Sequence, residues 1–119
     1  MEEQLLSDGH FADVRQHINA GLAGFRGQQP DTLKGFNALH AAVFEPVVLD
    51  KATKELIALA ISVATRCEPC VAFHTPGALK AGATREQIME MLSVAVLMGG
   101  GPSLMYAAKV VQAVEEAES

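Results

Sequence analysis

The chain reads Glu55-Leu-Ile-Ala-Leu-Ala-Ile-Ser-Val-Ala-Thr-Arg-Cys67-Glu-Pro-Cys70-Val-Ala-Phe-His74 across its middle. This stretch joins an almost wholly apolar run to the only two cysteines of the protein, and a histidine follows the second cysteine by four residues. The apolar run predicts a helix that other elements must cover on nearly every face. If the cysteine segment is helical too, at about 100° per residue, both sulfurs and the imidazole project within roughly 60° of one another.

The cysteine pair predicts redox or metal chemistry. A thiolate is the reactive form of cysteine, a nearby imidazole can take its proton, and the second thiol can close a disulfide on whatever the first has become. A helix N-terminus lowers the pKa of a thiol most at the first cysteine, which favours Cys67 as the reactive group. His74 lies one turn beyond Cys70, which favours the second cysteine instead.

Length and composition predict one domain over residues 1–119, and half of the residues are hydrophobic although only 5% are aromatic. Such a core suits closely packed helices.

The net charge of −5 argues against nucleic acid or an anionic membrane as a partner. No stretch has the pattern of a signal peptide or a membrane span, so we expect a cytoplasmic protein. In a reducing compartment, paired cysteines are more often catalytic or metal-binding than structural.

Helix-spaced apolar residues and the residues that stop them predict the first two helices. The first carries Leu5, Leu6, Phe11, Val14 and Ile18. It should end at Gly21 and Gly24, before a polar linker over residues 26–30. Asp31 can cap a second helix, and Pro46 should stop it.

Capping residues predict the third and fourth helices. Asp50 has the character of an N-cap for a helix over residues 51–66. The fourth helix should begin around residues 67–69 and close at Gly82. Pro76 lies in its interior and predicts a bend, or an early end, just after His74.

The remaining capping and helix-breaking residues complete the prediction of an all-α fold of about six helices. Thr84 and Gln87 form a capping box for a fifth helix that ends at residues 99–101, and Pro102 opens the sixth. The glycine run is read as a helix break, because no strand precedes it and no Lys-Ser/Thr follows it. Five other helices are too few to cover the apolar third helix. We therefore expect the protein to oligomerise through its apolar helices.

The spacing from Glu55 through the two cysteines to His74, with glycine signatures at residues 81–88 and 98–103, resembles the carboxymuconolactone decarboxylase-like superfamily. Within it, the chain resembles the alkyl hydroperoxidase D (AhpD)-like branch, from about residue 44 to residue 108. The resemblance implies an all-α bundle assembled as a homotrimer or homohexamer. It also implies a thiol-dependent peroxidase or protein disulfide oxidoreductase that contributes to antioxidant defence.

The resemblance implies a role for each site residue. Cys70 is the nucleophile that meets a small peroxide or disulfide substrate, and Cys67 is the resolving thiol. His74 takes up or relays the Cys70 proton, and Glu55 holds and polarises that histidine. No cofactor is needed, and a thiol reductant or a peroxiredoxin is the implied protein partner. Pro69 departs from the family, since it stands where the hydroperoxidase has a further relay histidine.

Three alternatives accompany this interpretation. Cys67, Cys70 and His74 could bind zinc with Glu55 as a fourth ligand, although three ligands on one helical face converge poorly on a tetrahedron. Lactone decarboxylation names the superfamily, but the sequence shows no cluster of Arg and His for a dicarboxylate. A non-catalytic oligomeric scaffold is the third. Glu55 could also merely pair with a neighbouring lysine, and no chemistry is assigned to the other histidines, which are His10, His17 and His40.

Overall fold

Six helices and no strand make up residues 2–119, the part that this computed structural model describes, with side chains described from Gly9 onward. The helices are α1 (Glu2–Gln28), α2 (Pro30–Phe44), α3 (Lys51–Ala64), α4 (Glu68–Lys80), α5 (Arg85–Gly99) and α6 (Gly101–Glu118). The prediction of an all-α fold with six helices is confirmed. The predicted apolar residues Leu5 and Leu6 lie outside the described side chains. Within the described residues, no helix is long and apolar enough to cross a membrane.

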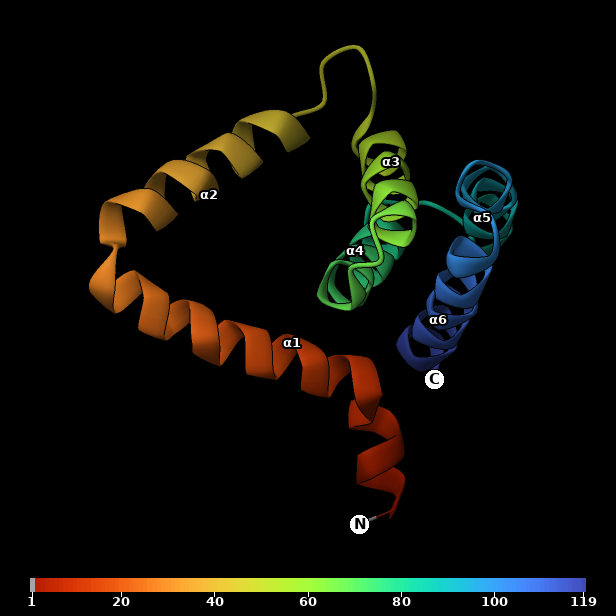
Figure 1. The fold of residues 1–119 in the computed structure, drawn as a ribbon, viewed down its shortest axis with the longest axis horizontal. Helices are drawn as coiled ribbons and strands as arrows, with labels where there is room; N and C mark the ends of the chain where they lie inside the picture. Colours follow the sequence, from red (N-terminus) through yellow and green to blue (C-terminus); the bar gives the residue numbers. More distant parts are fainter. Residues whose placement is uncertain (1) are drawn as a thin grey trace.

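The helices divide into a packed body and an arm (Figure 1). Helices α3 to α6 form the body, while α1 and α2 make a V that reaches away from it. The radius of gyration is 15.0 Å, whereas a domain of this length typically has about 13.5 Å. The core therefore lies almost wholly between α3, α4, α5 and α6. Its largest fully buried apolar side chains are Leu59, Val63, Val71, Ile88, Val110 and Val114.

The first helix is longer than predicted. It continues through Gly21 and Gly24 to Gln28, so the expected end at these glycines is wrong. Glycine costs an exposed helix only about 1 kcal/mol relative to alanine, which is too little to break it. The predicted linker shrinks to Gln29, because Pro30 suits the first turn of α2 and takes the start that was expected at Asp31.

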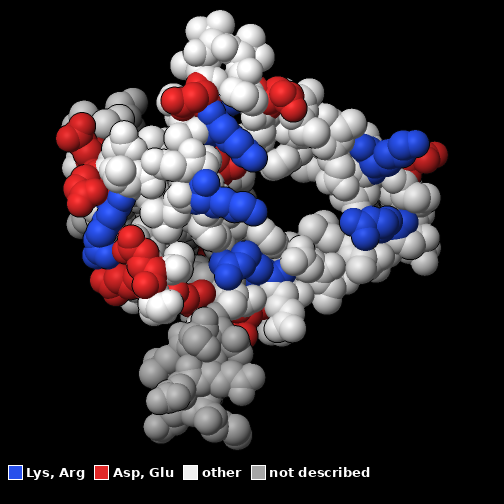
Figure 2. Space-filling view, turned by 180° about the vertical axis from the view of Figure 1, so that it is seen from behind, with Lys and Arg blue, Asp and Glu red and all other residues white. Residues whose placement is uncertain are grey.

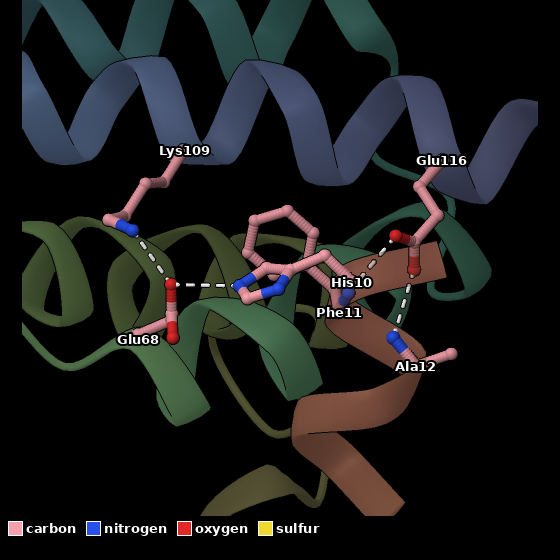
Figure 3. Close-up of polar contacts among 6 residues, drawn as sticks. All are labelled: His10, Phe11, Ala12, Glu68, Lys109 and Glu116. Carbon is pink, nitrogen blue, oxygen red and sulfur yellow. Dashed lines mark hydrogen bonds and ion pairs between the residues drawn. The ribbon is translucent and has the colours of Figure 1, made fainter. Parts of the chain in front are cut away.

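The break in α1 lies at Gly9 instead, and α6 holds it in place. Gly9 has a φ of 68°, a left-handed conformation that favours glycine. The Glu116 carboxylate accepts the backbone N–H groups of Phe11 and Ala12 at 3.0 Å each and so caps the second part of α1 (Figure 3). A Cβ at Gly9 would collide with that carboxylate. Phe11 is thereby seated in the core, only 3% exposed.

The predicted starts of the body helices are confirmed. Asp50 caps α3 by accepting the Thr53 N–H at 2.7 Å. Hydrogen bonds from the Thr53 side chain and then its backbone lower the pKa of Asp50. Thr84 and Gln87 form both hydrogen bonds of the predicted capping box, at 2.9 and 3.1 Å. Each of these signals acts within one helical turn.

Pro76 does not end α4, which continues to Lys80, so an early end just after His74 is wrong and the predicted close near Gly82 is confirmed. Proline has no N–H, and inside a helix it leaves the carbonyl four residues earlier without its partner. That carbonyl belongs to Ala72, and Arg15 of α1 donates to it from Nη1 at 2.7 Å. The arm therefore satisfies the acceptor that Pro76 leaves free.

The replacement of a backbone N–H by Arg15 as the donor to the Ala72 carbonyl leads to a testable prediction. Arg15→Met should lower the free energy of unfolding by about 1–3 kcal/mol, because it leaves a part-buried carbonyl unsatisfied. The loss should be smaller in a Pro76→Ala background, where residue 76 can supply its own N–H. Urea denaturation of the four proteins measures this coupling, and Arg26→Met, at the exposed end of α1, is the control. An equal loss in both backgrounds would show that Arg15 stabilises by packing alone.

Candidate functional site

The turn between α3 and α4 delivers the first cysteine to the site. Helix α3 ends in a Schellman motif, in which the Cys67 N–H donates to Ser62 O at 3.0 Å and the Arg66 N–H donates to Val63 O at 3.2 Å. Arg66 takes the left-handed position, with a φ of 59°, where glycine is the usual residue. The chain therefore turns within two residues, and α4 begins directly after Cys67.

The two cysteines are joined by a disulfide at the start of α4. Cys67 is the N-cap of the helix, with an extended backbone, and its Sγ accepts the Cys70 N–H at 3.2 Å. The expected arrangement of both sulfurs and His74 on one continuous helix is therefore wrong, because only Cys70 and His74 are helical. Pro69 occupies the first turn, where its missing N–H costs little.

Glu55 and His74 meet where α3 packs against α4. His74 Nδ1 donates to Glu55 Oε2 at 2.9 Å, and the glutamate is only 6% exposed. A carboxylate has only acceptors, so this bond places the hydrogen on Nδ1 and leaves Nε2 of a neutral ring free to accept a proton. The structure thus brings together the two residues that the spacing singled out, on the helix face that continues from Cys70.

Gly77 makes room for this pair. A Cβ on residue 77 would lie 2.8 Å from Glu55 Oε2, closer than real side chains approach. Glycine therefore allows the buried carboxylate to lie against the backbone of α4 within reach of His74. Both irregular residues of α4 are matched by residues of other helices. Arg15 of α1 donates to the carbonyl that Pro76 leaves free, and Glu55 of α3 lies against Gly77.

Two aromatic rings from α2 cover His74. The Phe44 ring lies 5.9 Å from the His74 ring, and the His40 ring lies 6.4 Å from it and nearly parallel. His40 and Phe44 also contact each other, with centroids 4.7 Å apart. No chemistry was assigned to His40 from the sequence, yet the structure places it beside the candidate site. No local signal could have found it, because the contact depends on how α2 folds back on α3.

An apolar pocket of about 430 Å³ adjoins His74. The residues that line it are Val43, Phe44, Lys54, Ile57, Ala58, Ile61 and His74. Lys54 is not paired with Glu55. Its ammonium donates to Val43 O at 2.8 Å and to Glu45 O at 2.6 Å, and so caps the C-terminal end of α2. The position of α2 over His74 is therefore held by Lys54.

The structure also bears on the zinc alternative. Within the described residues, no group of three or more His, Cys, Asp or Glu side chains is arranged to hold a metal ion. Zinc binds cysteine as thiolate, and the sulfurs of Cys67 and Cys70 are bonded to each other here. Any zinc site would therefore require the reduced protein.

Fold and site together define a small all-α protein in which one helix has a disulfide at its start and, one turn beyond Cys70, a histidine hydrogen-bonded to a buried glutamate. The model of the carboxymuconolactone decarboxylase family matches residues 30–113, and the chain belongs to this family. It is similar to a solved protein of that family from Legionella pneumophila, with a TM-score of 0.88 and 46% identity over 92% of this chain and 97% of that one. The resemblance seen in the sequence is therefore confirmed.

Two relatives at the level of sequence extend this result. The chain is 42% identical over 92 residues to an uncharacterised protein of Cupriavidus necator, which covers 77% of this chain and 81% of that protein. It is 38% identical over 93 residues to the alkyl hydroperoxide reductase AhpD of Mycobacteroides abscessus. The second match covers 78% of this chain but 41% of the relative.

Proposed function

We propose that this protein is a thiol-dependent peroxidase or protein disulfide oxidoreductase that cycles between a Cys67–Cys70 dithiol and its disulfide. One observation carries the proposal, namely that the disulfide opens a helix on which His74, hydrogen-bonded to the buried Glu55, follows Cys70 by one turn. The similarity to AhpD supports it. A nucleophile near an imidazole that a carboxylate orients is the usual arrangement for activating a thiol.

The proposed cycle begins with the reduced protein. His74 takes the proton of the Cys70 thiol, and the thiolate attacks the terminal oxygen of a hydroperoxide. The O–O bond breaks, the alcohol leaves with the proton from His74, and Cys70 becomes a sulfenic acid. The Cys67 thiol then forms the S–S bond and releases water. An external dithiol then reduces the Cys67–Cys70 disulfide by thiol–disulfide exchange, and its own two thiols become a disulfide.

Lactone decarboxylation is the second candidate, because it is the reaction in the family's name. A dicarboxylate lactone would need cationic groups near His74. The lysine at the adjoining pocket, Lys54, already donates to two backbone carbonyls, and the rest of that lining is apolar or aromatic. We therefore favour dithiol chemistry.

Intact-mass spectrometry tests the proposal directly. One equivalent of hydroperoxide added to the reduced protein should remove two hydrogens as the Cys67–Cys70 bond forms, with one equivalent of alcohol released. The Cys67→Ser variant is the matched control and should gain one oxygen on Cys70 instead. A reduced protein that binds zinc and keeps both thiols after peroxide treatment would support the metal-binding alternative.

We also propose that the chain forms a homo-oligomer, a trimer or a hexamer, as the apolar third helix and the family suggest. Ile57 and Ile61 of α3 are 46% and 56% exposed, and Leu97 and Met98 at the end of α5 are about 80% exposed. The space-filling view shows an opening between arm and body, with uncharged surface above and below it and Lys or Arg side chains on its two sides (Figure 2). Large contiguous apolar patches are rare on the surface of monomers, so exposed apolar side chains one helical turn apart, such as Ile57 and Ile61, favour an interface.

The expected result is a stable oligomer at micromolar concentration in sedimentation velocity. Leu97→Lys or Ile61→Lys should shift the distribution toward smaller species, because each places a charge among the side chains that an interface would bury. Lys34→Met, a change on an exposed position of α2, serves as the control. A wild-type chain that sediments as a monomer would contradict the proposed assembly.

A further inference from the structure

A second polar cluster, apart from the Glu55–His74 pair, surrounds Glu68 at the start of α4 (Figure 3). Glu68 follows Cys67 and is the first residue of α4. Its Oε2 atom accepts a hydrogen bond from Lys109 Nζ of α6 at 2.7 Å and from His10 Nε2 of α1 at 3.1 Å. Three helices thus contribute to one carboxylate that the proposed cycle does not use.

The position of this carboxylate conflicts with thiol activation. The free N–H groups at the start of α4 favour a negative charge on sulfur, and Cys67 Sγ already accepts one of them. A carboxylate on the next residue opposes that effect, because like charges disfavour ionisation of a neighbouring group. An unpaired Glu68 would therefore raise the pKa of the Cys67 thiol.

Lys109 and His10 offset the charge of Glu68. The hydrogen bond from Lys109, followed by that from His10, lowers the pKa of Glu68, so its carboxylate is ionised at neutral pH. The side chains that contact it are the Lys109 ammonium from α6 and the His10 ring from α1, and among the described residues no charged side chain of α4 contacts it. Compensation of the charge next to Cys67 thus comes from outside the helix that carries the cysteines.

We propose that Lys109 is a positioning residue for the redox pair: its ammonium offsets the Glu68 carboxylate at the start of α4, so that a thiolate can form at Cys67 near neutral pH. This inference rests on the proposed dithiol function. The simpler interpretation is an ordinary surface ion pair, which contributes little to stability and nothing to the thiols. The two interpretations differ in what happens to the cysteines.

The test uses the reduced full-length chain and a charge cycle. In a Cys70→Ser background, Lys109→Met should raise the pKa of Cys67 and slow its alkylation by iodoacetamide at pH 7 by about three- to tenfold, since one pKa unit is tenfold in thiolate. Glu68→Gln should shift the pKa in the opposite direction. The double variant should return close to the parent, and Lys109→Arg should keep the parent value because it keeps the charge.

A second readout uses the protein with both cysteines. The potential of the Cys67–Cys70 couple, measured against a dithiothreitol redox buffer, should become more negative in Lys109→Met, because a less favourable thiolate destabilises the reduced form. Lys80→Met removes an equivalent charge from the other end of α4 and is the matched control.

Two outcomes would overturn the inference. In one, Lys109→Met behaves like Lys80→Met in both readouts. In the other, the double variant is as perturbed as Lys109→Met alone, which would show a structural effect rather than a charge effect. Neither measurement requires peroxide turnover, so a failed peroxidase assay and a failed charge cycle are distinguishable.

Discussion

Replacing Cys70 with serine is expected to abolish peroxide and disulfide turnover. The hydroxyl of serine is a far weaker nucleophile than a thiolate, and no second cysteine remains to form the S–S bond with Cys67. Unfolding measurements on reduced samples provide the control, because the reduced variant should be as stable as the reduced parent. Steady-state turnover close to that of the parent would rule out the dithiol mechanism.

The partner variant, Cys67→Ser, should fail at a later step. Its Cys70 should react once with a hydroperoxide and stop as a sulfenic acid, or react once with a disulfide and stop as a mixed disulfide. Trapping with dimedone followed by mass spectrometry identifies the first product, and non-reducing electrophoresis identifies the second. A sulfenic acid that accumulates on Cys67 in the Cys70→Ser protein would exchange the two roles, as the N-cap position of Cys67 allows.

The second large effect is expected at Glu55 and His74. In a Cys67→Ser background, His74→Ala or Glu55→Gln should raise the pKa of Cys70 toward about 8.5, leaving only about 3% thiolate at pH 7. Removing the histidine deletes the proton acceptor. Glutamine can still accept the Nδ1 hydrogen through its amide oxygen, but it removes the negative charge that favours a protonated ring. The rate of alkylation of Cys70 against pH reports the pKa directly.

The double variant tests whether the pair acts as a unit. It should lose little more than the worse single variant, because residues on one proton path are not additive. Gly77→Ala should raise the pKa of Cys70 in part, although neither Glu55 nor His74 is replaced, because the added Cβ would displace the Glu55 carboxylate. His17→Ala, on an exposed position of α1, is the control. Additive losses, or an unchanged titration, would leave the helix N-terminus as the better explanation of thiol reactivity.

Helix boundaries were predictable where their signals are local. Asp50 reaches Thr53, and Thr84 exchanges hydrogen bonds with Gln87, so each cap is complete within three residues. The expected end at Gly21 and Gly24 failed because glycine only weakens a helix, and nothing in the neighbouring sequence supplies a stop. The real break at Gly9 depends on Glu116, which lies at the other end of the chain.

Pro76 shows why the continuity of α4 could not be judged from its own residues. Its local effect, a free carbonyl at Ala72, was foreseeable from the sequence. The helix continues because Arg15 occupies that carbonyl from a position 57 residues away. Whether a proline ends a helix thus depends on a donor that no local pattern reveals.

The sequence by itself determined the helical class, the family, and the spacing that allows Glu55, Cys67, Cys70 and His74 to form one site. These features depend on contacts within a few turns or on residue types at set intervals, which a linear pattern records. Only the tertiary structure decided what surrounds the site. In the folded chain, α2 lies back against the body so that His40 covers His74. His10 of α1 and Lys109 of α6 both contact Glu68. Such contacts join residues up to 58 positions apart, and packing of whole helices sets their geometry.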